Sequence, residues 1–499
     1  MLIRLEYGEC QQDKTFLQKV TIMSSQGKHS FSSPGKRSLV TCLAIIVLLL
    51  TGCSPQVSRQ APPLQPEGGF SGSGQEQLPE QWWLTFEDQT LDSLISRALA
   101  GNFTLQTAWD RVDRAYAVAR KAGAALVPQV DADIGLGTQR SRISSRTDSS
   151  QSYNLGLAAS YEVDLWGRID SITTAAELDA QASTEELQTA ALTLSAQVAA
   201  TWFQLLEQRG QIEILGQQIR TNEKTLEIIS LQFRTGQVGI ADVLQQRQVV
   251  ETQRGELALT AGRAQVRQNQ LAILLGISPT HFTQSTTDNL DALPPLPATG
   301  LQSDLIENRP DVRAAWLKLQ AADKRVAAAV ADRFPRLSLT GRASTTSEEI
   351  EDLFDDWLAS LAANLLTPII DGGRRRAEVE RTESVASEAL HQYGQTVLDA
   401  LLEVEDALTR EEKQLEYLIS VNRQLELAGQ ATERIRDRYL NGAEDYQRVL
   451  TSLISEQRLQ RTRLTAKREL FENRVNLCRA LAGGWEMTRK PEQTPLRGE

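Results

Sequence analysis

The feature that most constrains this chain is that its sequence is written twice. Matching residues recur in the same order, almost without gaps, at an offset of 206 or 207 positions: Trp109 and Trp316, Pro128 and Pro335, Gly167 and Gly373, Phe233 and Tyr439, Gly236 and Gly442, Gly276 and Gly483. Solenoid repeats are far shorter, about 20–50 residues. The chain is therefore expected to contain two copies of one large structural unit.

Each unit is predicted to begin with a helix that a proline ends and to continue with two strands. The helices are expected from Leu91 to Leu126 and from Leu301 to Phe334. In the first unit apolar and polar residues alternate over 130–137 and again over Tyr153–Leu165, with a polar loop expected at 139–152. In the second unit the alternation at 336–343 leads through an acidic loop at 347–356 to a strand over Trp357–Ile370, with Pro368 near its end.

A very long helix is expected next in each unit. Apolar residues recur every three or four positions from Leu187 through Trp202 and on to Phe233, and Trp166 to Phe233 spans roughly 100 Å if helical. The second unit repeats this from Arg374 to Leu440, with the seam residues Leu401, Leu408, Leu415 and Leu425. Glycine-containing turns at 234–242 and 440–448 reverse the chain, and a return helix of about 35 residues follows each turn.

Such a unit cannot cover its own apolar seam or pair all of its strand edges. A helical hairpin of roughly 100 Å with a narrow apolar seam has no globular core to cover that seam. Four membrane-suited strands leave open edges, and lipid offers no hydrogen-bond partner to an unpaired strand edge. Two chains would supply eight strands and three would supply twelve, and either number permits a closed barrel.

The N-terminal region is typical of an export signal. Lys36 and Arg37 precede the apolar run Leu39–Leu50, which is shorter than the roughly 20 residues of a membrane-spanning helix. The LTGC sequence at 50–53 resembles a bacterial lipobox, which implies that Cys53 becomes a lipidated N-terminus. A secretory signal with a coincidental cysteine is the alternative. Met23 suits this signal better as a start than Met1, and Ser54 favours the outer membrane by analogy.

Composition leaves little material for catalysis. A net charge of −11 argues against a nucleic-acid partner, and three histidines and four scattered cysteines form no metal or nucleophile constellation. His281 and His391 have no neighbouring triad sequence. The DGGRRR sequence at 371–376 lacks the spacing of a phosphate-binding loop. We therefore expect no enzyme, no cofactor and no metal site.

Taken together, the lipobox, a Pro- and Gly-rich tether and the duplicated plan resemble the TolC-type outer-membrane efflux factors, in their NodT/OprM-like lipoprotein branch. The opening WWLTFEDQTLDSLISRAL at 82–99, the strand exits DLWGR and PIIDGGRRR, and the YLNG turn are similar to motifs of that family. The resemblance covers about residues 40–485. It implies a mainly α fold with a membrane β-barrel. Three chains would share a 12-stranded barrel, a periplasmic α-barrel tunnel of 12 helices and an equatorial belt from 280–300 and the termini.

The resemblance also implies where function resides, because this family closes its tunnel at the helical turns. The candidate gate residues are Arg234, Gly236, Asp242, Tyr439, Gly442, Glu444, Asp445, Arg448 and Thr451. Family members often carry an acidic ring at the positions that here are Arg448 and Thr451, so an anionic ring is in doubt. Asp242, with Glu444 or Asp445, would supply charge or pair with Arg448. Ordinary capping and solvation of a turn is the alternative.

Six residues are expected at the joints between strands and helices: Pro128, Gly167, Pro335, Pro368, Gly372 and Gly373. Gly167 and Gly373 should lie at one level, near the inner leaflet of the outer membrane. The expected domains are a signal peptide (1–52), a lipidated tether (53–81), the first repeat (82–279), an equatorial linker (280–300), the second repeat (301–485) and a tail (486–499).

The predicted function is that of a passive outer-membrane exit duct for small molecules, lipid-anchored and extending into the periplasm. The family implies a homotrimer, a periplasmic adaptor protein and an inner-membrane pump, expected to be RND-type. One alternative is a duct for type I polypeptide secretion. Another is a periplasmic coiled-coil lipoprotein scaffold without a pore, although a scaffold has no need of four two-faced strands.

Overall fold

A computed structural model describes residues 68–144, 146–282, 290, 292–485, 487 and 489. The chain divides into Met1–Ser54 and Pro55–Glu499, and every described residue belongs to the second unit. The proposed signal peptide and Cys53 therefore lie outside the described residues, as do Met1 and Met23. No helix among the described residues is long and apolar enough to cross a membrane.

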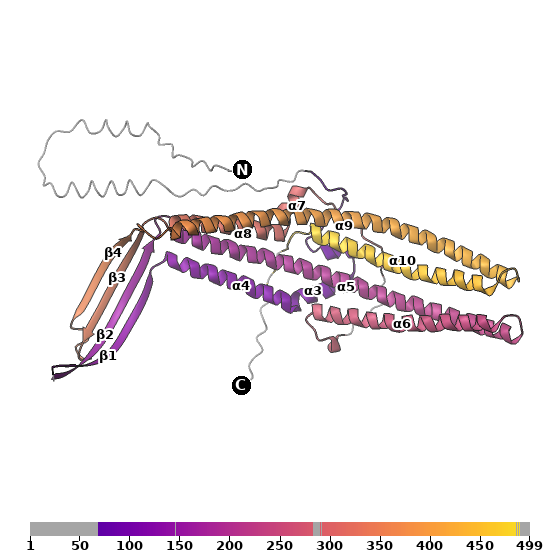
Figure 1. The fold of residues 1–499 in the computed structure, drawn as a ribbon, viewed down its shortest axis with the longest axis horizontal. Coiled ribbons are helices and arrows are strands. Elements are labelled where there is room, and N and C mark those ends of the chain that lie inside the picture. The colour runs from indigo at the N-terminus through magenta and orange to yellow at the C-terminus, as the bar shows by residue number, and fades with distance from the viewer. Residues whose placement is uncertain are drawn as a thin grey trace, which may run out of the picture. The chain divides into compact units, whose positions relative to one another are not determined.

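The described chain is mainly helical, with one sheet of four antiparallel strands (Figure 1). The helices are α3 (Gln89–Gly101), α4 (Phe103–Gly123), α5 (Arg168–Arg234), α6 (Ile240–Leu274), α7 (Gln302–Asn308), α8 (Pro310–Ala331), α9 (Arg374–Leu440) and α10 (Tyr446–Leu481). The strands are β1 (Gln129–Ile143), β2 (Arg146–Val163), β3 (Arg336–Ser347) and β4 (Trp357–Leu366). Three short 3₁₀ helices are η1 (Trp82–Phe86), η2 (Ala124–Leu126) and η3 (Pro279–His281).

The long helices and their return helices are confirmed. Both α5 and α9 contain 67 residues, and α9 has the predicted bounds. The return helices α6 and α10 contain 35 and 36 residues. The apolar spacing of three to four residues repeats over many helical turns in these elements, so the sequence predicts them more clearly than the shorter elements.

The opening helix of each unit is not continuous, contrary to the prediction. Asn102 ends α3 and caps α4, since its side chain accepts a hydrogen bond from the Leu105 amide at 3.0 Å. Its own amide group donates to the carbonyl of Leu274 at 2.9 Å. In the second unit Arg309 stands at the equivalent position, and Pro310 begins α8. The cap at Asn102 therefore separates α3 from α4, and Pro310 separates α7 from α8, although the apolar spacing predicted one continuous helix in each unit.

The strand boundaries also differ from the prediction. Residues 139–152 are not a loop, because the β1–β2 pairing continues through them, from Gln139 opposite Ser150 to Ile143 opposite Arg146. This outer end of the hairpin is polar, so it lacks the apolar alternation that marks the rest. At the other end β2 stops at Val163 rather than Leu165. The strand β4 stops at Leu366, which leaves Pro368 just outside the ladder.

Helices pack side by side in a consistent order. Near the sheet, α5 packs against α4 and α8, and α8 packs against α9. Towards the turns, α5 packs against α6 and α10, and α10 packs against α9. Figure 1 shows these helices running alongside one another, with α9 along one side and α4 and α6 along the other. The helical layer of this chain is therefore bordered by α9 on one side and by α4 and α6 on the opposite side.

The largest apolar core lies midway along the helices. It joins η1 and α3 to α5, α6 and α10 through residues such as Trp82, Trp202 and Phe471. Asp88 and Ser195 accept hydrogen bonds from the indole N–H groups of Trp202 and Trp82, at 2.7 and 3.1 Å. The buried indoles therefore have the partners that their N–H groups require.

A belt of irregular segments wraps this middle region. The amide of Gly74 donates to Pro297, and the amide of Ala298 donates to Glu76 at 2.7 Å, so the N-terminal segment pairs with the linker between the units. The buried Arg474 forms an ion pair with Glu411 and also donates to carbonyls of the linker. The linker is thereby fixed to both α9 and α10.

Candidate channel elements

The sheet has one apolar and one polar face, which the strand register defines. Ile134 lies opposite Leu155, Leu157 opposite Ala343, and Gly341 opposite Leu361, so apolar residues of all four strands share a face. The apolar face comprises Val130, Ala132, Ile134, Leu136, Tyr153, Leu155, Leu157, Ala159, Tyr161, Val163, Leu337, Leu339, Gly341, Ala343, Trp357, Ala359, Leu361, Ala363 and Leu365. Its large side chains are exposed in the single chain: Ile134 by 77% and Leu361 by 86%.

The height of the apolar face suits a membrane. Val163 and Tyr153 lie ten residues apart on β2, about 34 Å along a strand, or roughly 26 Å if the strand is tilted by about 40°. Outer-membrane barrels carry an apolar band about 25 Å tall with aromatic girdles at its rims. Tyr153 and Trp357 lie towards one rim and Tyr161 towards the other. The face therefore has both the height and the aromatic positions of a lipid-facing surface.

The opposite face of the sheet is polar. It carries Asp131, Asp133, Asn154, Ser160, Ser338, Thr340, Arg342, Ser344, Ser360 and Asn364. Asp133 accepts a hydrogen bond from Asn154 at 3.2 Å and lies 3.6 Å from Arg342. This side of the sheet is suited to water.

The joints between strands and helices lie together at one edge of the sheet. Val163 pairs with Leu337, which pairs with Leu365, so β2 and β4 end at the same level. Gly167 and Gly373 follow these ends, and each begins its long helix in the left-handed conformation, with φ of 69° and 86°. Gly372 is also left-handed, at 66°. A side chain at these positions would strain the backbone.

Aromatic stacking and ion pairs support this edge. Pro128 precedes β1, and Pro335 precedes β3. The indole of Trp166 donates to the Pro335 carbonyl at 2.7 Å and stacks on Phe334. On the other side Arg375 pairs with Asp332 and with Asp371, at 3.0 and 3.1 Å. The exits of the two repeats therefore contact each other through the segment that precedes β3.

The two helical turns share one backbone geometry. After α5 the amide of Gly236 donates to Phe233, and that of Gln237 to Gln232. After α9 the amide of Gly442 donates to Tyr439, and that of Ala443 to Arg438. Both glycines have φ near 70°, which matches a Schellman ending.

The charges at the turns do not match between repeats. Asp242 accepts from the Gly239 amide at 3.1 Å, and Asp445 accepts from the Arg448 amide at 2.9 Å, so both carboxylates cap return helices. Glu444 is largely buried between two arginines, Arg448 at 3.1 Å and Arg438 at 3.2 Å. Of the three predicted partners for Arg448, the ion-pair partner in this chain is Glu444. The residue of the first repeat at the position equivalent to Glu444 is Val238, which carries no charge.

An apolar cluster lies beneath the turns and carries two tyrosines. It contains Ile229, Val243, Tyr446, Val449 and Leu450. Tyr439 donates to Gln232 at 2.9 Å and Tyr446 donates to Gln246 at 2.5 Å, so each tyrosine joins the second hairpin to the first. Burial raises the pKa of both phenols, with the larger effect on Tyr446. Both contacts remain neutral hydrogen bonds at physiological pH.

The remaining gate candidates contribute no contact between hairpins among the hydrogen bonds and ion pairs described. Thr451 is exposed, and its hydroxyl donates to Gln447 within α10. Arg234 is exposed in the last turn of α5. The structure thus gathers the nine predicted residues at two neighbouring turns. Of these nine, Tyr439 bonds across to the first hairpin, and Tyr446, which was not among them, forms a second such bond beneath the turns.

Both sides of the single chain expose apolar stripes. On α6, Leu259, Val266 and Ile273 recur every seven residues with exposures of 64, 52 and 61%. On α9, Leu402 and Ile419 are exposed by 58 and 61%. Leu415, predicted on the apolar seam of the second long helix, is also 48% exposed, because α9 borders the chain's helical layer.

The chain matches the family model for outer membrane efflux proteins over residues 94–277 and 301–483. It belongs to the outer membrane efflux protein family. This efflux protein is 31% identical to the pyoverdine export outer membrane protein OpmQ of Pseudomonas putida, over 89% of this chain and 97% of the relative. It is 30% identical to the cation efflux system protein CusC of Escherichia coli O6:H1, over 88% of this chain and 98% of the relative.

A solved structure of the outer-membrane channel OprN is similar to this efflux protein throughout. The TM-score is 0.81 at 25% sequence identity, with 87% of this chain and 100% of that chain covered. The predicted fold class and the assignment to outer-membrane efflux channels are therefore confirmed. The family is one of channel proteins.

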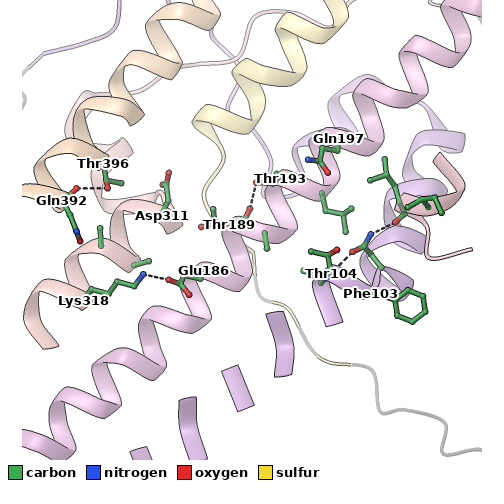
Figure 2. Close-up of a pocket in the computed structure, with 18 of the residues that line it drawn as sticks. Phe103, Thr104, Glu186, Thr189, Thr193, Gln197, Asp311, Lys318, Gln392 and Thr396 are labelled. Carbon is green, nitrogen blue, oxygen red and sulfur yellow. Dashed lines mark hydrogen bonds and ion pairs between the residues drawn. The ribbon is translucent and has the colours of Figure 1, made fainter. Parts of the chain in front are cut away.

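A recess of about 730 Å³ lies where α4, α5, α6, α8 and α9 approach one another (Figure 2). Figure 2 shows Lys318 and Glu186 directed toward each other at one end of it. The hydroxyls of Thr193 and Thr396 donate to carbonyls of their own helices, each at 2.9 Å. Its described lining contains no histidine or cysteine, and the described residues contain no cluster of three metal-ligating side chains.

Proposed function

We propose that three copies of this chain close into a passive exit duct across the outer membrane. The observation that carries this proposal is the two-faced sheet whose outermost strands, β1 and β4, each have one neighbour. Unpaired strand edges are too costly in lipid, so β4 of one copy must pair with β1 of the next. Three such sheets make a barrel of about twelve strands, lipid-facing outside and polar inside.

The helices support the same closure. The edges that remain open are β1, α4 and α6 on one side of the chain and β4 and α9 on the other. Exposed apolar residues such as Val266 and Ile419 lie on these two different sides. Contacts between unlike sides generate a closed ring when the rotation closes. A homotrimer is the stoichiometry that the family supports.

The duct is passive and works with partners. A periplasmic adaptor and an RND-type inner-membrane pump would supply the energy, since the duct's described residues carry no phosphate-binding loop. Lipidation at Cys53 would anchor the chain, and the two relatives named for pyoverdine export and for cation efflux support small molecules as the class of cargo. The protein acts as a conduit and not as an enzyme.

Its gate would lie at the two turns. The nine predicted turn residues lie at one end of the helices, and three copies around one axis would place every turn charge three times in a confined space. Glu444 is already shared by two arginines and Asp445 caps α10, so these charges balance and the second-unit turns would not contribute an anionic ring.

Purified full-length protein in planar bilayers tests the duct. We expect single-channel currents, whereas a coiled-coil scaffold would conduct nothing. Arg448→Ala and Asp242→Ala should change conductance or ion selectivity. If both variants match the wild type in both properties, the gate assignment is wrong although the duct stands. Labelling with radioactive palmitate, lost in Cys53→Ser, tests the anchor independently.

A further inference from the structure

The β1–β2 hairpin extends beyond the β3–β4 hairpin on the side of the sheet away from the helices (Figure 1). The strand β3 ends opposite Tyr153, whereas the pairing of β1 with β2 continues. We define the hairpin extension as this continued ladder, residues 137–143 of β1 with 146–152 of β2. It begins where the apolar face ends on these two strands, at Leu136 and Tyr153.

The lipid-facing side of the sheet carries two arginines into the extension. The pairing is uninterrupted from the apolar face onward, so successive side chains keep alternating between the two faces. By this register Arg140 and Arg142 lie on the same face as Ile134 and Leu136. Both arginines are exposed, and in the part of the chain that the structure describes neither forms an ion pair.

The acidic residue of the extension lies on the other face. The register places Asp148 on the polar face of the sheet, with Asp133. The arginines share their face with Ser149 and Gln151, and the Tyr153 hydroxyl donates to the Gln151 side chain at 3.1 Å. The lipid-facing side of the extension therefore presents positive charge and hydrogen-bonding groups, with no carboxylate among its described side chains.

The height of the arginines suits the headgroup layer of a membrane. Arg140 is four residues beyond Leu136, about 14 Å along the strand or roughly 10 Å along the membrane normal at a tilt of about 40°. The polar layer on each side of the hydrocarbon core is roughly 5–8 Å thick. The backbone at Arg140 therefore lies just outside this layer, and its long side chain can bend back into it. Arg142 lies one step further out on the same face.

The competing partner on the protein is the acidic loop at 347–356 between β3 and β4. None of its carboxylates pairs with Arg140 or Arg142 among the described residues. A phosphate group suits the arginines better, since a guanidinium binds phosphate oxygens through two parallel hydrogen bonds. The apolar face directly below the extension would hold the acyl chains of a lipid whose phosphate lies beside Arg140.

We propose that the hairpin extension binds the phosphate groups of lipids in the outer leaflet, with Arg140 and Arg142 as the contacting residues. This inference rests on the proposed duct function, which places the apolar face in lipid. Three copies would bind such lipids at three equivalent positions around the barrel. The contact fixes the height of the barrel in the membrane, because the charges cannot enter the hydrocarbon core without losing their phosphate partners.

The test measures binding of lipid A, which carries phosphates on its headgroup, to the purified full-length protein in detergent by native mass spectrometry. We expect Arg140→Gln and Arg142→Gln each to weaken binding about fivefold, and the two together about 25-fold. Arg342→Gln makes the same change of charge on the polar face and should leave binding unchanged. Arg140→Lys with Arg142→Lys keeps the charge and should retain most of the binding.

A glutamine pair that binds lipid A as tightly as the wild type overturns the proposal. So does an equal loss in Arg342→Gln, which would show a general effect of net charge. Weaker trimers with unchanged lipid binding in the glutamine pair would assign the arginines to the acidic loop of a neighbouring copy, and would overturn it as well.

Lipid A stripped of its phosphates provides a test that needs no variant. The wild type should bind it far more weakly than the phosphorylated lipid, and equal binding contradicts the proposal even if the glutamine pair does not fold. A wild type that conducts nothing in planar bilayers contradicts the duct function. A conducting wild type without phosphate-dependent binding contradicts the lipid site alone, so the two failures are distinguishable.

Discussion

The helices α5 and α9 occupy equivalent places in the two repeats, yet they are buried very differently. Both contain 67 residues, begin at a left-handed glycine and end in the same turn. The helix α5 lies between neighbours, so Trp202 and Leu215 are almost completely buried, whereas α9 exposes Leu402 and Ile419. The repeat therefore specifies the helix itself, and its position in the chain decides whether its apolar residues find partners within the same copy.

The largest expected effect contrasts a buried and an exposed apolar residue on these two helices. Trp202→Ala should lower the free energy of unfolding by about 3–5 kcal/mol, because it opens a cavity in the central core and removes the bond to Asp88. Leu415→Ala should change the stability of the single chain by less than about 0.5 kcal/mol. Denaturant unfolding in detergent measures both, and equal losses would contradict the contrast.

Assembly should respond in the opposite way. Leu402→Asp places a charge on the exposed side of α9, and burying it against a neighbouring copy costs at least ~2 kcal/mol per interface. We expect folded chains that no longer form trimers, measured by light scattering. Leu402→Ala serves as the control and should retain trimers. Trimers of normal stability in the aspartate variant would show that α9 does not face another copy.

The same contrast explains what could be predicted from the sequence. Periodicity located α5, α9 and their turns, because each apolar position repeats many times. It placed Leu415 on an apolar seam but did not show what covers that residue, because a periodic stripe does not show whether its partner is in the same copy. The break at Asn102 was not predicted, because the apolar spacing continues past it although its side chain caps α4 through the nearby Leu105 amide.

The two helical turns were predicted in position, but the contacts of their residues were not. The paired glycine turns and the charged residues were visible in the sequence. The buried amides were not, although Gln211, Gln218 and Asn222 interrupt the apolar pattern of α5 between Leu205 and Leu226. Polar residues in such a pattern are normally taken as solvent-exposed, and only the packing of α10 shows that they are enclosed.

A smaller effect tests whether the two strand exits are equivalent. Gly167→Ala and Gly373→Ala should each lower the free energy of unfolding by about 1–2 kcal/mol, because both residues have left-handed backbones. No neighbouring atom lies within 4 Å of an added side-chain carbon, so backbone strain is the whole of this cost. Gly216→Ala is the control in the middle of α5, where alanine should stabilise by about 0.5–1 kcal/mol. Unequal losses at the two exits, in the same unfolding experiment, would show that one joint tolerates a different conformation.

The smallest expected effect concerns the caps of the return helices, where the repeats differ chemically. Asp445 caps α10 with its side chain, whereas Gly239 stands at the equivalent place before α6. Asp445→Ala should destabilise by about 1 kcal/mol, but Asp445→Gly, which copies the first repeat, by only a few tenths, since glycine leaves the helix end accessible to water. Thermal unfolding of both variants separates these values. A glycine variant as unstable as the alanine variant would mean that Asp445 acts through more than its bond to the Arg448 amide, and that the second turn depends on its carboxylate in a way that the first turn does not.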